Sequence, residues 1–218
     1  MKKKLTGFKE HLNAGRGRFS VILVLCFIWW LDFFVSRQLE RNQLLETSLK
    51  GVLLRLDAAS TGALLIVSAG VIMALLRKKH QYLYRWCLAY LGVSVFQVLF
   101  NIVGMVLTAG HYNGSGLIAL WDVGFVYMQT VLVFMFIYVF LDLSTEGGAF
   151  IWPCRDGMDP EPPTLIDYLF ISLNVNSTYG PTSEDLVSRT AKLAMSLQVI
   201  LAIMILTVLI ARSVSSIS

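Results

Sequence analysis

Long runs of apolar residues without charge constrain this chain more than any other feature of its sequence. The clearest run covers residues 58–76, which lie between Asp57 and Arg77 and contain no charged residue. A helix needs about 20 such residues to cross the ~30 Å of hydrocarbon in a bilayer. Of the whole chain, 56% is hydrophobic and only 15% is charged. The sequence therefore predicts an integral membrane protein without a separate soluble domain.

The apolar runs together predict an all-α fold, a polytopic bundle of about five membrane spans. The first run follows a basic N-terminus, and a cleaved signal peptide is its alternative interpretation, although no small-residue cleavage site follows. A multi-pass protein of the plasma membrane, here the bacterial inner membrane, is expected. The predicted spans cover residues 19–34, 58–76, 86–109, 117–141 and 186–213.

The net charge of +4 does not indicate nucleic-acid binding, because Lys and Arg lie at the ends of the apolar runs. Anionic lipid head groups are the partners expected for residues in such places. The Arg77–Arg85 turn and the basic N-terminus both favour the cytoplasmic side of the membrane. Membrane lipids, and no nucleic acid, are therefore the predicted partners outside the protein itself.

Residues 37–57 form an amphipathic stretch, in which leucines recur at helical spacing among charged residues. A helix lying in the plane of the lipid head groups is one interpretation, and a solvated connector helix is the other. Small residues in the next run, Gly62 and Gly70 among them, predict close packing against a neighbouring helix. These observations divide residues 1–57 from a helical hairpin at residues 58–116.

Asp32, Gln97 and Asn101 are polar residues inside the predicted spans. Asp32 stands near the end of the first apolar run and is expected at the membrane interface. Gln97 and Asn101 are four residues apart and therefore share one face of a helix. Amides in this position predict hydrogen bonds between helices inside the bundle, with a role in a transport pathway as the alternative.

A short apolar segment at residues 165–175 is too short to cross the membrane. As a helix it would measure ~16 Å at 1.5 Å per residue, about half of the hydrocarbon thickness. Thr164 and Asp167 before and within it have the spacing of a capping box. Polar residues follow it, and then Gly180 and Pro181 break the chain. The pattern predicts a re-entrant helix and loop between two spans.

The residues of this region resemble the pore module of small bacterial potassium-channel-like membrane proteins. The resemblance lies in Asp-Tyr-Leu-Phe-Ile-Ser-Leu at 167–173, Ser-Thr-Tyr-Gly at 177–180 and Thr-Val-Leu-Ile-Ala-Arg at 207–212. It implies that residues 117–218 form an outer helix, a pore helix with its loop, and an inner helix. Pro181 and Thr182 stand where the family has Tyr-Gly, so the implied selectivity filter is degenerate and potassium selectivity does not carry over.

The resemblance implies a homotetramer that passes cations, because one loop supplies a quarter of a ring. Filter oxygens would come from four residues that would hold partly dehydrated monovalent cations, three polar side chains would line the vestibule, and two carboxylates would ring the mouth. The alternative is a non-conducting structural or interaction protein with the same fold, and a transporter is disfavoured because internal repeats are missing. The implied residues are Ser177, Thr178, Tyr179 and Gly180 for the filter, Asn174, Asn176 and Gln198 for the vestibule, and Glu184 and Asp185 for the mouth.

The family arrangement and the charge pattern disagree about orientation. Five spans put the termini on opposite sides, and the charge pattern favours a cytoplasmic N-terminus. The family would place the C-terminus in the cytoplasm instead, so either the pore module is inverted or the span count differs.

The sequence contains no signature of an enzyme. There is no His-Glu-x-x-His, Gly-x-Ser-x-Gly, Walker loop or Cys-x-x-Cys in it. Its histidines, His11, His80 and His111, are scattered and form a poor set of metal ligands. We therefore expect no catalytic residue, no metal site and no cofactor other than cations in the filter.

Overall fold

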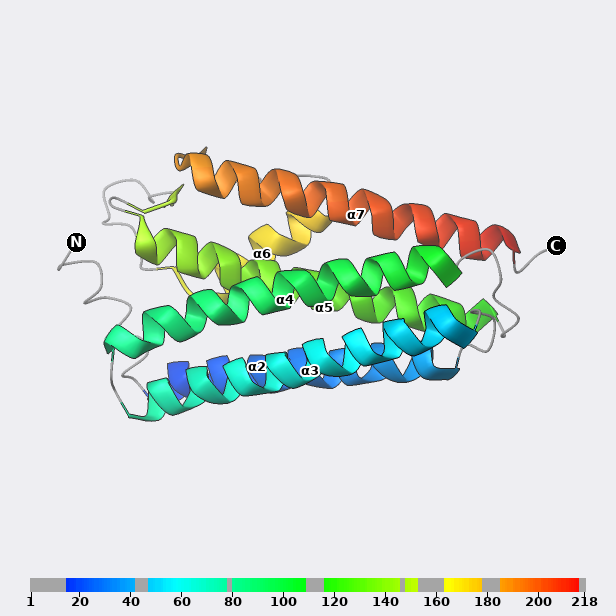
Figure 1. Cartoon of the computed structure of the whole chain (residues 1–218). Coiled ribbons are helices and arrows are strands. Elements are labelled where there is room, and N and C mark those ends of the chain that lie inside the picture. Colours follow the sequence, from blue (N-terminus) through cyan, green and yellow to red (C-terminus); the bar gives the residue numbers. More distant parts are fainter. Residues whose placement is uncertain are drawn as a thin grey trace. The chain divides into compact units, whose positions relative to one another are not determined.

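Helices make up most of the protein (Figure 1). The computed structural model describes residues 15–41, 47–77, 80–108, 116–145, 148–152, 163–177 and 185–215. Two short strands, β1 (Phe150–Ile151) and β2 (Asp185–Leu186), pair in antiparallel fashion. The helices are α2 (Gly15–Arg41), α3 (Thr47–Leu76), α4 (His80–Thr108), α5 (Gly116–Ser144), α6 (Leu165–Asn176) and α7 (Arg189–Ser215).

Four of these helices are long and apolar enough to cross a membrane. The candidate spans are Leu54–Leu76, Arg85–Val106, Trp121–Ser144 and Arg189–Ala211. They confirm the predicted all-α, multi-pass membrane protein. The first predicted span falls on α2, which has 27 residues and so measures about 40 Å. That α2 also crosses the membrane stays a prediction.

Helix α3 includes the second half of the amphipathic stretch at residues 37–57. In the described part of this stretch, α2 continues to Arg41, and α3 runs unbroken from Thr47 to Leu76. The reason is that α3 contains no proline, and its single glycines each cost a helix only about 1 kcal/mol. Asp57, the last residue of the stretch, is buried. A helix in the plane of the lipid head groups stays a prediction.

The chain divides into two compact units. Unit 1 comprises residues 1–24 and 131–202, and unit 2 comprises residues 25–130 and 203–218. Unit 1 therefore holds α6 with the second half of α5 and the first half of α7. Unit 2 holds most of α2, all of α3 and α4, and the first half of α5.

In unit 2, α3 and α4 pack closely through Gly70, as the small residues predicted. The indole ring of Trp86 lies so near that a Cβ atom at Gly70 would be 2.3 Å from ring atom Cε3. A Cβ atom at Gly62, by contrast, would meet nothing within 4 Å. Gly70 therefore provides the space that this contact requires.

Polar side chains from four helices meet inside unit 2 around Asp32. Asn101 of α4 and Gln129 of α5 both donate hydrogen bonds to Asp32, and Gln97 of α4 donates to Asp57 of α3. The prediction that Gln97 and Asn101 bond between helices is thus confirmed. Asp32, predicted at the membrane interface, is buried among these helices, with an exposed fraction of 0%. We call Asp32, Thr61, Asn101 and Gln129 the Asp32 cluster.

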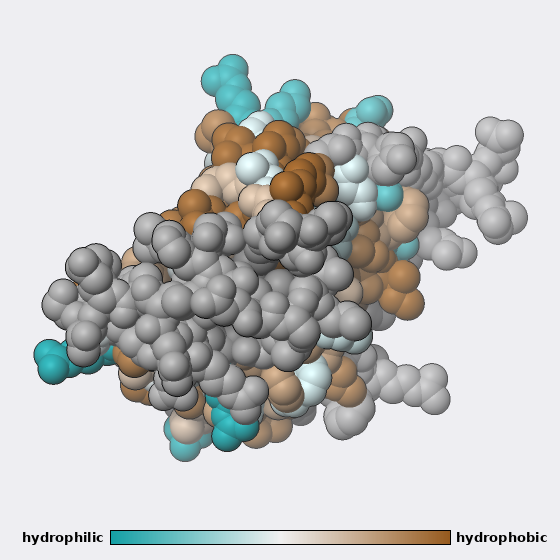
Figure 2. All heavy atoms as spheres, turned by 90° about the vertical axis from the view of Figure 1, so that its right-hand side faces the viewer, coloured by the Kyte–Doolittle hydropathy of each residue, from teal (hydrophilic) through white to brown (hydrophobic). Residues whose placement is uncertain are grey.

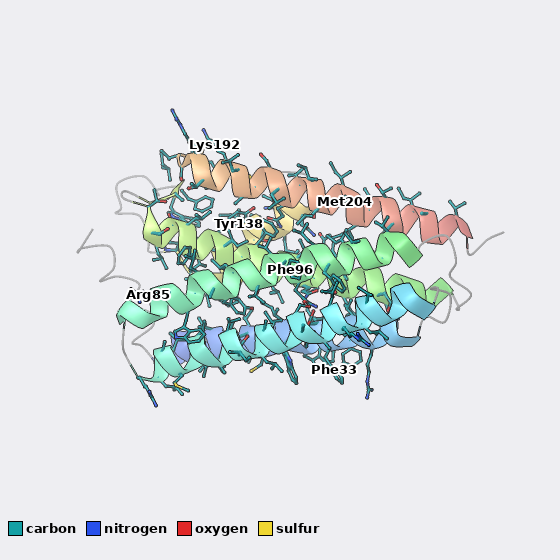
Figure 3. The ribbon with its side chains drawn as sticks, in the orientation of Figure 1. Phe33, Arg85, Phe96, Tyr138, Lys192 and Met204 are labelled. Atoms are coloured by element: carbon teal, nitrogen blue, oxygen red, sulfur yellow. The ribbon has the colours of Figure 1, made fainter. Side chains whose placement is uncertain are left out.

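Many large apolar side chains of the long helices face outward, as expected for helices surrounded by lipid. Phe33 of α2 and Phe96 of α4 are 41% and 52% exposed, and both are labelled in Figure 3. Figure 2 shows hydrophobic side chains, in brown, along the flanks of the face that it displays. Outward apolar faces of this kind need no protein partner in a bilayer.

Candidate functional site

The candidate site is built around α6, the short helix of unit 1. It has 12 residues and therefore measures about 18 Å. Its start is fixed as the sequence predicted, because the backbone N–H of Thr164 donates to the Asp167 carboxylate at 2.6 Å. Ser177 caps its other end, where the Ser177 N–H donates to the carbonyl of Leu173 at 2.9 Å. The predicted half-length helix is thus present, and both of its ends are capped.

Asp142, near the end of α5, holds the beginning of α6 and strand β1 together. Its Oδ2 atom accepts the phenol hydrogen of Tyr168 at 2.6 Å. Its Oδ1 atom accepts the backbone N–H groups of Ala149 at 2.6 Å and Phe150 at 3.2 Å. Burial, and then the negative charge of Asp142, raise the pKa of the Tyr168 phenol. The phenol therefore stays protonated and keeps donating at physiological pH.

The two strands connect the segments before and after α6. Phe150 in β1 pairs with Leu186 in β2, and Ile151 pairs with Asp185. The Phe150 ring also meets the rings of Tyr138 and Tyr168 edge to face. Asp185, predicted at a pore mouth, is exposed in this strand pair.

A chain of hydrogen bonds fixes the middle of α6 to α5 and α7. The Ser172 hydroxyl donates to the carbonyl of Val131 in α5 at 2.7 Å. The Gln198 amide of α7 donates to the carbonyl and hydroxyl of Ser172 at 2.9 and 3.0 Å. In return, its oxygen accepts the phenol hydrogen of Tyr138, which is labelled in Figure 3. Ser172, Gln198 and Tyr138 are each 0% exposed.

The burial of Gln198 disfavours the prediction that it lines a pore vestibule. A side chain that lines a vestibule must face water, whereas Gln198 is fully buried within one chain. Both ends of its amide are bonded to groups of the same unit. Gln198 is therefore a positioning residue, which determines where α6 lies relative to α7.

Two asparagines stand near the end of α6 with unused hydrogen-bonding capacity. Asn176 is 4% exposed, and neither its amide nitrogen nor its oxygen has a hydrogen-bond partner among the described residues. The amide nitrogen of Asn174, which is half-buried, also has none there. Burial of Asn176 suits the alternative that it braces the loop better than a place in open water.

The described residues contain only one member of the predicted filter. Ser177 is exposed, and its hydroxyl donates to the carbonyl of Leu173 at 2.8 Å. Thr178, Tyr179, Gly180 and Glu184 lie outside the described residues. The filter and its mouth therefore stay predictions.

Sequence reasoning missed the residues that hold α6 in place. Tyr168, Ser172 and Asn176 recur every four residues, so they share one face of α6, and all three are buried. Polar residues at this spacing in an apolar helix are the signal that could have found them. Tyr138 and Asp142 share a face of α5 for the same reason.

No protein-family model, no curated protein and no solved structure matches the chain. A proposal of function therefore depends on the geometry of the site. The resemblance to potassium-channel-like proteins therefore stays a prediction.

Proposed function

We propose that this chain is one subunit of a homotetrameric cation channel of the pore-loop class, in the plasma membrane. In this proposal α5 is the outer helix, α6 the pore helix and α7 the inner helix. Residues 177–180 form a non-standard filter for monovalent cations. The observation that carries the proposal is α6 itself, a half-length apolar helix bonded between two helices of spanning length.

The length of α6 requires shelter inside a membrane protein. At about 18 Å, the helix ends far short of the ~30 Å of hydrocarbon. Polar backbone at membrane depth is tolerated only where protein buries it or where it lines a water-filled cavity. The hydrogen bonds from Tyr168 and Ser172 to α5 supply shelter on one side of α6. A pore at the tetramer axis would supply the water on the other side.

The direction of α6 favours cations over anions. A helix carries a partial negative charge at its C-terminus, and the predicted filter follows the C-terminus of α6 directly. The carbonyls of the filter would add further partial negative charge. Glu184 and Asp185, if they ring the mouth, would raise the local concentration of cations. These charges all have the sign that a cation pathway needs.

An outward face of α7 fits an inner helix that meets its copies around a central axis. In unit 1, Leu193 and Ile200 are 71% and 55% exposed. Ser196, between them, is also exposed, and its hydroxyl is satisfied by the carbonyl of Lys192 in the same helix at 2.9 Å. Lipid alone accounts for the apolar residues, so the oligomeric state has to be measured.

The filter sequence supports weak selectivity. Its only glycine is Gly180, and the following Pro181 has a fixed φ and no N–H. A multi-site filter needs several residues whose backbone turns carbonyls inward, which glycine permits most easily. We therefore propose a short site that passes monovalent cations with little discrimination.

The proposal is tested with the purified protein in planar bilayers and by native mass spectrometry. A tetramer should pass cation current, and Thr178→Ala should change its conductance. Ser144→Ala is the matched control, since the exposed Ser144 hydroxyl bonds to the Leu141 carbonyl of its own helix and to no other described residue. A tetramer silent under voltage, pH and calcium would favour the non-conducting interaction protein. A monomer would remove the channel proposal altogether.

A further inference from the structure

Asp32 lies well inside the membrane by the register of its neighbours in unit 2. Thr61, which bonds to it, is seven residues from the start of the span Leu54–Leu76, about 10 Å along the helix. Gln129 is eight residues from the start of the span Trp121–Ser144, about 12 Å along. The two helices give the same depth. The Asp32 carboxyl group is therefore placed below the head groups, in the hydrocarbon region.

The two oxygens of Asp32 differ in how fully they are occupied. Oδ1 accepts two amide N–H groups, from Asn101 at 3.2 Å and from Gln129 at 3.0 Å. Asn101 also donates to the side-chain oxygen of Gln129 at 2.9 Å, which ties the two amides together. Among the described residues, Oδ2 accepts only the hydroxyl hydrogen of Thr61, at 3.1 Å. Oδ2 therefore keeps a free lone pair, and its single partner can either donate or accept.

No positive charge compensates Asp32 within the described part of the chain. Its partners there are two amides and a hydroxyl, which are neutral. Arg37, one turn further along α2, has its guanidinium over the ring of Phe33, 5.0 Å from the centroid, and Phe33 faces outward. An ionised carboxylate without a cationic partner is costly in the membrane interior, and such residues are usually functional.

Other titratable groups face the Asp32 cluster from the helices packed against it. On α3, Asp57 is buried one turn from Thr61 and lies 3.4 Å from the Gln97 amide nitrogen. On α4, Tyr90 is close enough for the charge of Asp32 to act on its phenol. On α5, Asp122 is buried two turns before Gln129. The charged groups among these are acidic.

A second feature of the same region points to a missing positive partner. Gln97 is 0% exposed, and its side-chain oxygen has no hydrogen-bond donor among the described residues. A buried amide oxygen in this state is rare, because leaving it unsatisfied is costly. The polar interior of unit 2 therefore has spare acceptors on Asp32 and on Gln97.

We infer that Asp32 is a proton-binding site within the membrane, independent of the proposed pore. A proton taken from water binds to Oδ2, and the new O–H donates to the hydroxyl oxygen of Thr61. The Thr61 hydroxyl hydrogen turns to a carbonyl of its own helix one turn back, as threonine hydroxyls commonly do. The amide bonds of Asn101 and Gln129 to Oδ1 remain. Both protonation states are thus held by one set of side chains.

Infrared spectroscopy of the full chain in lipid vesicles tests this inference. A protonated buried carboxyl group has a C=O stretch that a carboxylate lacks, and this band should grow as the pH is lowered. Asp32→Asn should reduce the band, to which the buried Asp57 and Asp122 can also contribute. Asp185→Asn, which changes an exposed carboxylate in β2, should leave it unchanged. An undiminished band in Asp32→Asn, or no band that grows as the pH is lowered, overturns the inference.

Two further measurements keep the test decisive if Asp32→Asn does not fold. Thr61→Val removes a donor to the carboxylate, so the midpoint of the band should move to higher pH by about one unit. An unmoved midpoint contradicts the role given to Oδ2. Replacing potassium by sodium or N-methylglucamine at constant pH should leave the band unchanged. A midpoint that follows the metal ion would assign the site to that ion instead of the proton.

Discussion

The Gln198 side chain of α7 donates a hydrogen bond to the backbone carbonyl of Ser172 in the middle of α6, at 2.9 Å. Side-chain amides seldom reach a carbonyl inside another helix, because helix carbonyls are already bonded within their own helix. The contact fixes the height of α6 along α7. Any movement of α7 in unit 1 must therefore move α6 or break this bond. In a pore-loop channel the two helices would be those that bear the gate and the filter.

Replacing Gln198 by Leu should destabilise the protein by about 1–3 kcal/mol for each buried group left without a partner. The Tyr138 phenol would lose its partner, whereas the Ser172 hydroxyl keeps its bond to the Val131 carbonyl. Thermal unfolding in detergent, followed by circular dichroism, measures the loss. Ser196→Ala on the exposed side of the same helix is the control and should change stability by less than about 0.5 kcal/mol. Equal stabilities of the two variants would contradict the bracing role.

Replacing Tyr168 by Phe should cost about 1.5–3 kcal/mol, the range for a hydrogen bond to a charged group. The phenol donates to Asp142, and no other donor reaches Oδ2 among the described residues. Asp142→Asn weakens the same bond from the other side. Since both changes remove one interaction, their effects in a double mutant should be clearly less than additive. Additive effects would show that the Tyr168–Asp142 bond contributes little to stability.

The start of α6 could be predicted from sequence because its determinants are local. Thr164 and Asp167 are three residues apart, and their capping bonds form within one turn. The burial of Asp32 could not be predicted, because it depends on which residues of α4 and α5 lie opposite. Two of its three donors, Asn101 and Gln129, are 69 and 97 residues away in the chain. Hydropathy places a lone aspartate at a helix end, but three donors from other helices can hold it inside.

The same distinction applies to Gln198. Helical spacing gives the face on which a residue lies, but not which neighbour covers that face. The family arrangement implies a place for Gln198 in the pore vestibule. The deciding facts were the positions of Ser172 and Tyr138 in space, and neither is encoded near residue 198.

Replacing Gly70 by Ala should weaken the α3–α4 pair by about 1–3 kcal/mol, the usual cost of forcing extra volume into a packed contact. The new Cβ atom would lie 2.3 Å from the Trp86 ring, so the ring or the helix must shift. Gly62→Ala in the same helix meets open space and should be neutral or stabilising, because alanine favours helix more than glycine does. Unfolding of both variants in detergent gives the comparison, and a smaller Trp86 side chain should rescue Gly70→Ala.

Restoring the family pattern in the loop should increase potassium selectivity if the resemblance is correct. The change is Pro181→Tyr with Thr182→Gly, which supplies the Tyr-Gly that this chain lacks. It restores a backbone N–H at position 181 and allows positive φ at position 182, so carbonyls there can turn toward a permeating ion. The reversal potential under opposed potassium and sodium gradients measures the effect. Thr182→Gly alone is the control, because Pro181 still fixes the backbone and no gain in selectivity should follow. If the double variant conducts with an unchanged permeability ratio, the loop does not act as a filter of this family, and the current takes another path through the protein.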